Sequence, residues 1–157
     1  MGTNDIFDIL KTEFGDYILE YKDQQPVDPY ILVNPDQLFD ICHTLRDKEE
    51  FQFDYLMSLS GMDLGEKLGV VYHLYSMNHK HKVVLKVSVP KEDPKVPSVE
   101  RIWRSADWHE REAYDLMGIH FEGHHNLIRI LCPYDWEGHP LRKDYQAPEF
   151  YHGMEVS

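Results

Sequence analysis

Three consecutive β-type segments in the middle of the chain constrain its fold more than any other feature. They cover residues 51–59, 68–77 and 82–89. All three are rich in valine, leucine and tyrosine, and turn-forming residues separate them, so they should pair as two consecutive hairpins. Lys82 and Lys86 flank apolar residues, which indicates that one face of the resulting sheet is exposed to solvent.

Further helix- and strand-forming segments precede these hairpins. Asn4 can cap a first helix over about residues 5–14. Two short strands are expected over residues 17–21 and 30–33. The Asn-Pro pair at 34–35 is typical of a helix start. The second helix that follows has an apolar stripe made of Leu38, Ile41, Cys42 and Leu45.

A helical pattern returns after the third β-type segment. Ser98 is expected to start a short helix, and a longer helix should run from Asp107 to Gly118. Asp107 and Glu110 have the spacing of an acidic capping box, and Gly118 suits the left-handed position that ends a helix. The order helix–strand–strand–helix–strand–strand–strand–helix predicts an α+β fold, with helices packed on a mostly antiparallel sheet.

The C-terminal segment has a different composition from the rest of the chain. Pro133, Pro140 and Pro148 exclude a long helix, and residues 127–131 are its only β-type run. Aromatic residues and arginines are frequent there and aliphatic residues are few, as in protein–protein hot spots. We therefore expect a globular domain over residues 1–121 and an extended partner-docking arm over residues 122–157.

Opposite charges gather on the last predicted helix and in this arm. The helix acids are Asp107, Glu110, Glu112 and Asp115. The arm bases are Arg129, Arg142 and Lys143. Our hypothesis is that the arm folds back so that the bases meet the acids, because bidentate arginine–carboxylate pairs would fix a segment without regular backbone pairing. Within the helix, Arg111 and Asp115 are four residues apart and can also pair.

The overall composition excludes several classes of function. A net charge of −12 argues against a nucleic-acid-binding face, which needs basic patches. Two cysteines, Cys42 and Cys132, are too few for an iron–sulfur cluster or a zinc site built from thiolates. No apolar run approaches the roughly 18 residues that cross a bilayer. These features predict a soluble chain that is at most peripheral to a membrane.

Most of the histidines lie in the C-terminal third, so a metal site has to be weighed. The sequence HEREA at 109–113 misses the HExxH zinc motif because Ala113 replaces the second histidine. His120, His124 and His125 can approach a metal only if a loop brings them together. No GxSxG, P-loop or GxGxxG motif is present. The clustered histidines still leave a free-standing metal hydrolase as one alternative function. A plain soluble binding module is another.

Residues 110–145 resemble the signature of a known family. They begin with EREAYDLMGIHFEGHHNLIRIL at 110–131 and end with EGHPLRKDY at 137–145. Both motifs resemble the signature of the 30-kDa subunit family of proton-pumping NADH:quinone oxidoreductase, respiratory complex I (the C subunit of the bacterial enzyme). The signature residues expected at a partner interface are Glu110, Arg111, Glu112, Tyr114, Asp115, Gly118, Phe121, His124, Arg129, His139, Pro140, Arg142, Lys143, Asp144 and Tyr145. His125 departs from the pattern, because the family usually has proline there.

The resemblance implies a subunit without catalytic residues or a cofactor of its own. Flavin, iron–sulfur clusters and quinone would be bound by partner subunits, and the arm would lie along the large hydrogenase-like (D or 49-kDa) subunit. The chain would then act as a scaffold in electron transfer from NADH to quinone, peripherally on the cytoplasmic side of the inner membrane. An equivalent subunit of a membrane-bound nickel–iron hydrogenase, formate-hydrogen lyase or F420-type dehydrogenase is the alternative within this resemblance.

Overall fold

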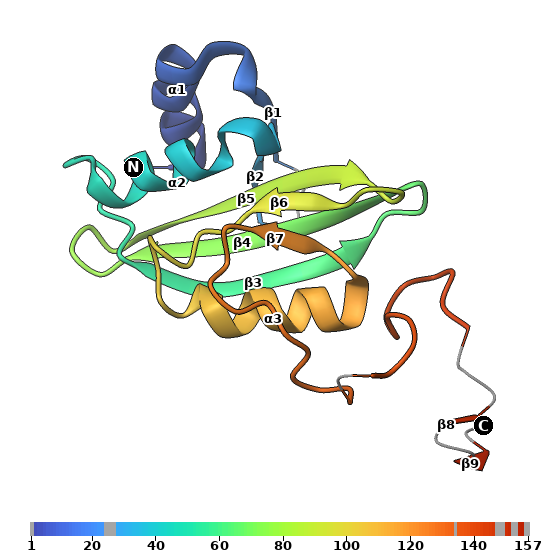
Figure 1. Cartoon of the computed structure of the whole chain (residues 1–157). Helices are drawn as coiled ribbons and strands as arrows, with labels where there is room; N and C mark the ends of the chain where they lie inside the picture. The colour runs from blue at the N-terminus through green and yellow to red at the C-terminus, as the bar shows by residue number, and fades with distance from the viewer. Residues whose placement is uncertain (1, 24–27, 134, 147–149, 152–153, 156–157) are drawn as a thin grey trace.

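A five-stranded mixed sheet organises the computed structural model (Figure 1), which describes residues 2–23, 28–133, 135–146, 150–151 and 154–155. The helices are α1 (Thr3–Phe14), α2 (Leu38–Asp47) and α3 (Ala106–Met117), with the 3-10 turns η1 (Gly15–Tyr17) and η2 (Pro35–Gln37). The strands are β1 (Ile18–Lys22), β2 (Tyr30–Val33), β3 (Tyr55–Asp63), β4 (Lys67–Ser76), β5 (His81–Pro90), β6 (Lys95–Pro97), β7 (His120–Glu122), β8 (Phe150–Tyr151) and β9 (Met154–Glu155). Pro148, one of the prolines noted above, lies outside the described residues.

The predicted hairpins form the centre of the sheet. The strand order is β1-β2-β5-β4-β3, with β3, β4 and β5 paired antiparallel in sequence. Strand β2 pairs with β5 in parallel, so the sheet is mixed but mostly antiparallel. On β5, Lys82 is exposed and Lys86 is half-buried, whereas the alternate residues Val83 and Leu85 belong to the core. The predictions of an α+β fold and of one wetter sheet face are therefore confirmed.

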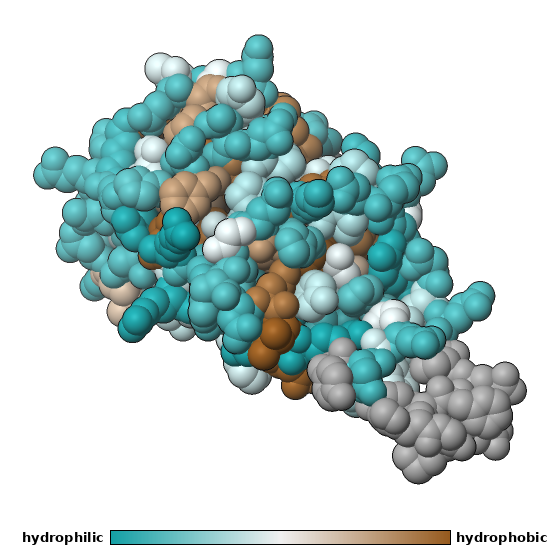
Figure 2. All heavy atoms as spheres, in the orientation of Figure 1, coloured by the Kyte–Doolittle hydropathy of each residue, from teal (hydrophilic) through white to brown (hydrophobic). Residues whose placement is uncertain are grey.

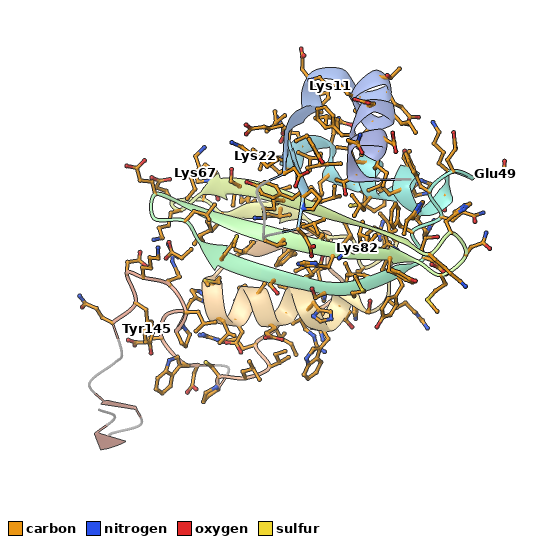
Figure 3. The ribbon with its side chains drawn as sticks, turned by 180° about the vertical axis from the view of Figure 1, so that it is seen from behind. Lys11, Lys22, Glu49, Lys67, Lys82 and Tyr145 are labelled. Carbon is orange, nitrogen blue, oxygen red and sulfur yellow. The ribbon has the colours of Figure 1, made fainter. Side chains whose placement is uncertain are left out.

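The core lies between the other sheet face and the helices. Four alternate side chains of β4 are buried in this core: Leu68, Val70, Tyr72 and Leu74. The inner side chains of all three helices pack in the same core. Helix α3 runs along the edge strand β3, and the C-terminal segment continues beneath it in the view of Figure 1. Seen from behind, Lys11 on α1 and Tyr145 lie at opposite ends of the molecule (Figure 3).

Helix starts were predicted with mixed success. Asn34 accepts a hydrogen bond from the Asp36 amide, as a capping residue does, but a 3-10 turn precedes the α-helical part. For α1 the prediction was wrong, because the helix begins two residues earlier than expected. Its N-cap is Gly2, whose amide donates to the Asp5 carboxylate at 3.0 Å. A carboxylate in the first turn satisfies a free helix-start amide as well as a side-chain cap does.

Two predicted elements did not form. Residues 98–105 make turns instead of a short helix, although Ser98 Oγ accepts from the Glu100 amide as a capping residue would. Residues 127–131 form no strand. Strand β6 instead pairs in parallel with β7, a pairing that no local pattern indicated.

Candidate functional site: the anchored C-terminal segment

The Asp115 carboxylate is the centre of the contacts between α3 and the C-terminal segment. Asp115 is fully buried, and its Oδ1 accepts from Arg129 Nε at 2.6 Å. Its Oδ2 accepts from three consecutive backbone amides, those of Ile130, Leu131 and Cys132, at 3.2, 2.6 and 2.9 Å. Burial alone would raise the pKa of Asp115, but these donors outweigh it and lower the pKa. A single side chain thus satisfies amides that a strand partner would otherwise pair.

Arg129 extends this network along the segment. Its side chain is 8% exposed, and its guanidinium also donates to the carbonyl oxygens of Asp115, Trp136 and Gly138. One arginine therefore joins α3 to two later points of the chain. Since these acceptors are backbone carbonyl oxygens or a buried carboxylate, Arg129 fixes Trp136 and Gly138 relative to α3.

His139 adds a contact at the end of α3. Its Nδ1 lies 2.9 Å from the Asp115 carbonyl oxygen. Gly118 ends the helix with φ +77°, as predicted, and a Cβ there would stand 2.6 Å from His139 Cδ2. The Leu141 amide then donates to the Leu116 carbonyl oxygen at 2.8 Å. Gly118 is required twice, for its backbone conformation and for the close approach of the imidazole ring.

The GHPLRKDY residues fold into a compact turn below this helix end. Gly138 has φ +83°, and a Cβ there would lie 3.0 Å from the Tyr145 ring. Trp136 Nε1 donates to the Tyr145 hydroxyl at 3.0 Å, and Pro140 is half-buried. The Tyr114 ring lies 5.8 Å from the His139 ring, centroid to centroid. The turn is therefore held by ring contacts as well as by hydrogen bonds.

The predicted pairing of helix acids with arm bases is only partly right. It is confirmed for Arg129 with Asp115, and it is wrong for Arg142 and Lys143. The Arg142 guanidinium pairs with Asp144 at 3.2 Å and donates to the Lys91 carbonyl oxygen at 3.3 Å. Lys143 makes its contact to a carboxylate through the backbone amide, and that carboxylate belongs to β3 and not to the helix.

This second carboxylate, Asp63, was missed by the sequence analysis. It ends β3, and its side chain is 3% exposed. It accepts from the Lys143 amide at 2.6 Å, from Lys91 Nζ at 2.9 Å and from the Gly65 amide at 2.9 Å. The Lys143 amide, followed by Lys91, holds the pKa of Asp63 well below its usual range. Asp63-Leu64-Gly65 predicts only a turn, and nothing local indicates a partner eighty residues away.

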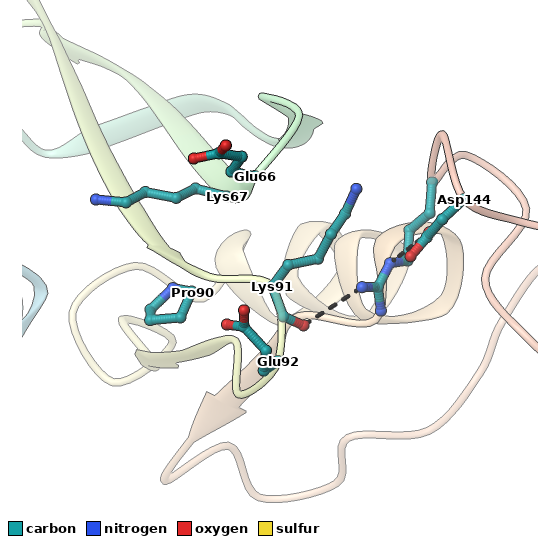
Figure 4. A pocket seen from close by; sticks show the side chains of 7 residues that line it. Glu66, Lys67, Pro90, Lys91, Glu92 and Asp144 are labelled. Carbon is teal, nitrogen blue, oxygen red and sulfur yellow. Dashed lines mark hydrogen bonds and ion pairs between the residues drawn. The ribbon is translucent and has the colours of Figure 1, made fainter.

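An open pocket lies beside Asp63, between the end of β5 and the C-terminal turn (Figure 4). Its lining is almost entirely charged: Glu66, Lys67, Pro90, Lys91, Glu92, Arg142 and Asp144. The bond from Arg142 to the Lys91 carbonyl oxygen crosses it. This open depression carries charges of both signs, and its lining contains none of the aromatic or branched aliphatic residues that are typical of a small-molecule site.

Glu110 faces the opposite side of α3 from this segment. It is fully buried, and it accepts from Ser98 Oγ at 2.6 Å and from the Val99 amide at 2.9 Å. The predicted capping box is therefore wrong, since Glu110 bonds to a distant turn and α3 has no side-chain cap. Burial, with smaller contributions from Glu100 and Asp107, raises the pKa of Glu110 to about 7.

Three further signature residues, Arg111, Glu112 and Phe121, lie outside the network of side-chain hydrogen bonds around Asp115 in the described part of the chain. Arg111 pairs with Asp107 at 3.3 Å and not with Asp115, so that predicted pair is also wrong. Phe121 belongs to the core, and Glu112 lines a shallow groove between α3 and β3.

Four potential metal ligands come together at the start of α3: Glu100, Asp107, His124 and His125. His124 is fully buried, with Nε2 2.9 Å from Asp107 Oδ1 and 3.3 Å from Glu100 Oε2. Its Nδ1 accepts from the Asn126 amide, which places the ring proton on Nε2. A metal-bound histidine instead offers a bare nitrogen to the ion and donates from the other one. The hydrogen bond from the Asn126 amide turns Nε2 towards the carboxylates of Glu100 and Asp107, where Asp107 Oδ1 is buried without a hydrogen-bond partner among the described residues.

His125, the departure from the family signature, belongs to the same group of side chains. Its backbone amide and its Nδ1 each lie 2.8 Å from Glu100 Oε1. The turn at Gly123–Asn126 is thereby held by Glu100 without the proline.

Large apolar side chains remain exposed along the anchored segment. Ile128, Leu131 and Leu141 are 49, 59 and 56% exposed. Figure 2 shows an apolar stripe running over the region where the C-terminal segment passes below α3, within an otherwise hydrophilic face. Among the described residues, no helix is both long and apolar enough to cross a membrane.

Comparison with known proteins places this geometry in a family. Residues 31–151 match the family described as respiratory-chain NADH dehydrogenase, 30 Kd subunit. The chain is 50% identical over 151 residues to the C subunit of the NADH-quinone oxidoreductase of Chloroherpeton thalassium, covering 94% of this chain and 62% of that protein. It is 42% identical to the protein of the same name from Chlorobium phaeobacteroides, covering 96% of this chain and 92% of the relative.

Solved structures show the same fold. A trypsin-resistant fragment (1–134) of Nqo5 superposes with a TM-score of 0.64 at 27% identity, covering 78% of this chain and 98% of the fragment. An archaeal respiratory membrane complex, the membrane-bound sulfane sulfur reductase, contains a chain with a TM-score of 0.73 at 21% identity, covering 91% of this chain and 85% of that one. The second likeness concerns the fold alone. With its family match and its relatives, this chain belongs to the 30-kDa subunit family of the respiratory-chain NADH dehydrogenase.

Proposed function

We propose that the chain is a scaffold subunit of a respiratory NADH:quinone oxidoreductase and takes part in electron transfer without catalytic residues of its own. Its relatives are named as the C subunit of that enzyme, and the Chloroherpeton relative is longer than this chain. Flavin, iron–sulfur clusters and quinone would be held by partner subunits. The chain would sit peripherally on the cytoplasmic side of the inner membrane.

The observation that carries the proposal is the contrast between the two sides of the C-terminal segment. Its inner side is held by Asp115 and Arg129, whereas Leu131 and Leu141 are more than half exposed, Leu141 at the rim of the groove between α3 and β3. Fixing apolar side chains before contact lowers the entropy cost of association. Such anchored apolar residues are typical of a docking surface. We infer that these leucines lie against the large hydrogenase-like subunit.

The test is co-purification from detergent-solubilised membranes with a tagged full-length chain. Iron–sulfur subunits should co-purify with the parent chain and be lost when residues after Phe121 are deleted. Leu131→Glu should weaken co-purification by about tenfold or more, because a charge would be buried against the partner.

A matched control is Leu19→Glu, which puts the same charge on an equally exposed leucine of β1. It should leave co-purification unchanged. A truncated chain that still assembles fully would contradict docking through this segment.

A further inference from the structure

We propose that Asp63 is a positioning residue that fixes the turn at residues 142–145 for docking on the partner subunit. This rests on the proposed function above. Asp63 lies outside the signature and ends a strand that the signature does not include. Its role follows from which groups its two carboxylate oxygens accept.

The carboxylate is saturated by donors from three parts of the chain. The Gly65 amide comes from the carboxylate's own turn, Lys91 Nζ from the residue after β5, and the Lys143 amide from the C-terminal turn. The Asp63 side chain is 3% exposed, so these donors occupy most of the surface of its carboxylate. The bond to Lys143 is therefore part of a closed network.

The same turn is held at a second point close by. Arg142 donates to the Lys91 carbonyl oxygen, so Lys91 contributes its side chain to Asp63 and its backbone to Arg142. Within the turn, the Tyr145 amide donates to the Arg142 carbonyl oxygen at 3.1 Å. Residues 142 and 143 are thus bound to the sheet end, whereas Leu141 just before them is bound to α3 through its amide.

The consequence concerns Leu141, which lies between the two anchors. Asp115 and its partners hold the segment up to His139, the Leu116 carbonyl oxygen of α3 accepts from the Leu141 amide, and Asp63 holds the chain again at Lys143. Leu141 is 56% exposed between these fixed points. Without Asp63, the residues that directly follow Leu141 would lose one of their two attachments to the sheet, and Leu141 would be fixed only from the side of α3.

Asp63→Asn tests this with little change of shape. An amide side chain has one acceptor where the carboxylate has two, so it cannot satisfy all three donors. Trypsin cleaves after arginine and lysine, and Arg142 and Lys143 lie in the turn itself. We expect cleavage of the full-length variant at these sites to be about tenfold faster than in the parent, with the globular part still folded by circular dichroism. Co-purification with the iron–sulfur subunits should weaken in parallel.

Glu66→Gln is the matched control, because it removes one charge from the same β3–β4 turn, where Glu66 is exposed. Trypsin should cleave this variant at the same rate as the parent, and the variant should co-purify with the iron–sulfur subunits as the parent does.

Each outcome has a separate meaning. Unchanged cleavage of Asp63→Asn would overturn the anchor. Faster cleavage with unchanged co-purification would show an anchor that docking does not need, and would also overturn the inference. Failure of the parent chain to co-purify would instead overturn the proposed function, while the cleavage comparison would still report on the anchor.

Discussion

Asp115 and Glu110 lie on the same helix and are both fully buried, yet their pKa values move in opposite directions. Burial raises the pKa of both carboxyl groups. Asp115 meets one arginine and three amides, which stabilise the charged form enough to lower its pKa. Glu110 has two neutral donors and acidic neighbours, and its pKa rises to about 7. The number and charge of donors decide the sign.

Because its pKa is raised, Glu110 should make the folded protein less stable as the pH rises. Its folded pKa of about 7 exceeds the ordinary value of 4.5, so the folded protein binds the proton more tightly than the unfolded chain does. The free energy of unfolding should therefore fall as pH rises from 4.5 towards 7, by up to about 3 kcal/mol from this group. Above that range the loss is complete and constant.

Glu110→Gln should remove this part of the pH profile. A glutamine can accept from the Val99 amide and donate to Ser98 Oγ, so both contacts survive without a charge. We expect the variant to be more stable than the parent above pH 7, measured by urea unfolding at pH 5, 6, 7 and 8. Glu112→Gln, two residues along the same helix, should keep the slope of the parent. A variant slope equal to the parent's would contradict the assignment to Glu110.

At the scale of elements, the central hairpins were predictable from the sequence. For α3, the residue that ends the helix was predictable, but the contacts at its start were not. Each strand of β3–β5 has its own apolar pattern, and short turns leave few ways to pair them. Gly118 was predicted from its residue type, since few other residues adopt φ +77°. The start of α3 was predicted to within one residue, but its capping contacts were not, because Glu110 uses its oxygens on Ser98 and Val99.

Gly118→Ala separates the two requirements at the end of α3. The left-handed backbone alone should cost about 1 kcal/mol, and the new Cβ would also displace His139, 2.6 Å away. We expect a total loss of about 2 kcal/mol or more in the free energy of unfolding, with faster proteolysis after Arg129.

Gly123→Ala provides the comparison for this measurement. Gly123 has φ +86°, and a Cβ there would meet nothing within 4 Å. Only the backbone cost should appear in urea unfolding. Equal losses in the two variants would show that the approach of His139 is unimportant.

Across the whole molecule, stability should decline from the sheet to the C-terminal segment. Strands β4 and β5 are central and buried, whereas the segment after residue 123 has few backbone pairs of its own. Local opening of such a segment takes less free energy than global unfolding. Four amides are exceptions because each donates to the buried carboxylate of Asp115 or Asp63: those of Ile130, Leu131, Cys132 and Lys143.

Hydrogen exchange on the full-length chain checks this order. The amides of β4 and β5 should exchange most slowly, and the four amides bound to Asp115 or Asp63 should exchange at least about tenfold more slowly than their neighbours in the segment. Uniform, fast exchange from residue 124 to residue 146 would show that the anchors do not persist in solution.

The sequence by itself determined the α+β class, the paired hairpins and the family signature, because each of these is written in residues that are close together in the chain. The tertiary structure alone decided which acid meets which donor. Asp63 accepts from Lys143, and Asp115 accepts from Ile130, Leu131 and Cys132, through backbone amides that every residue type except proline has. Contacts between a carboxylate and a distant backbone amide leave no pattern of residue types, so only the folded chain reveals them.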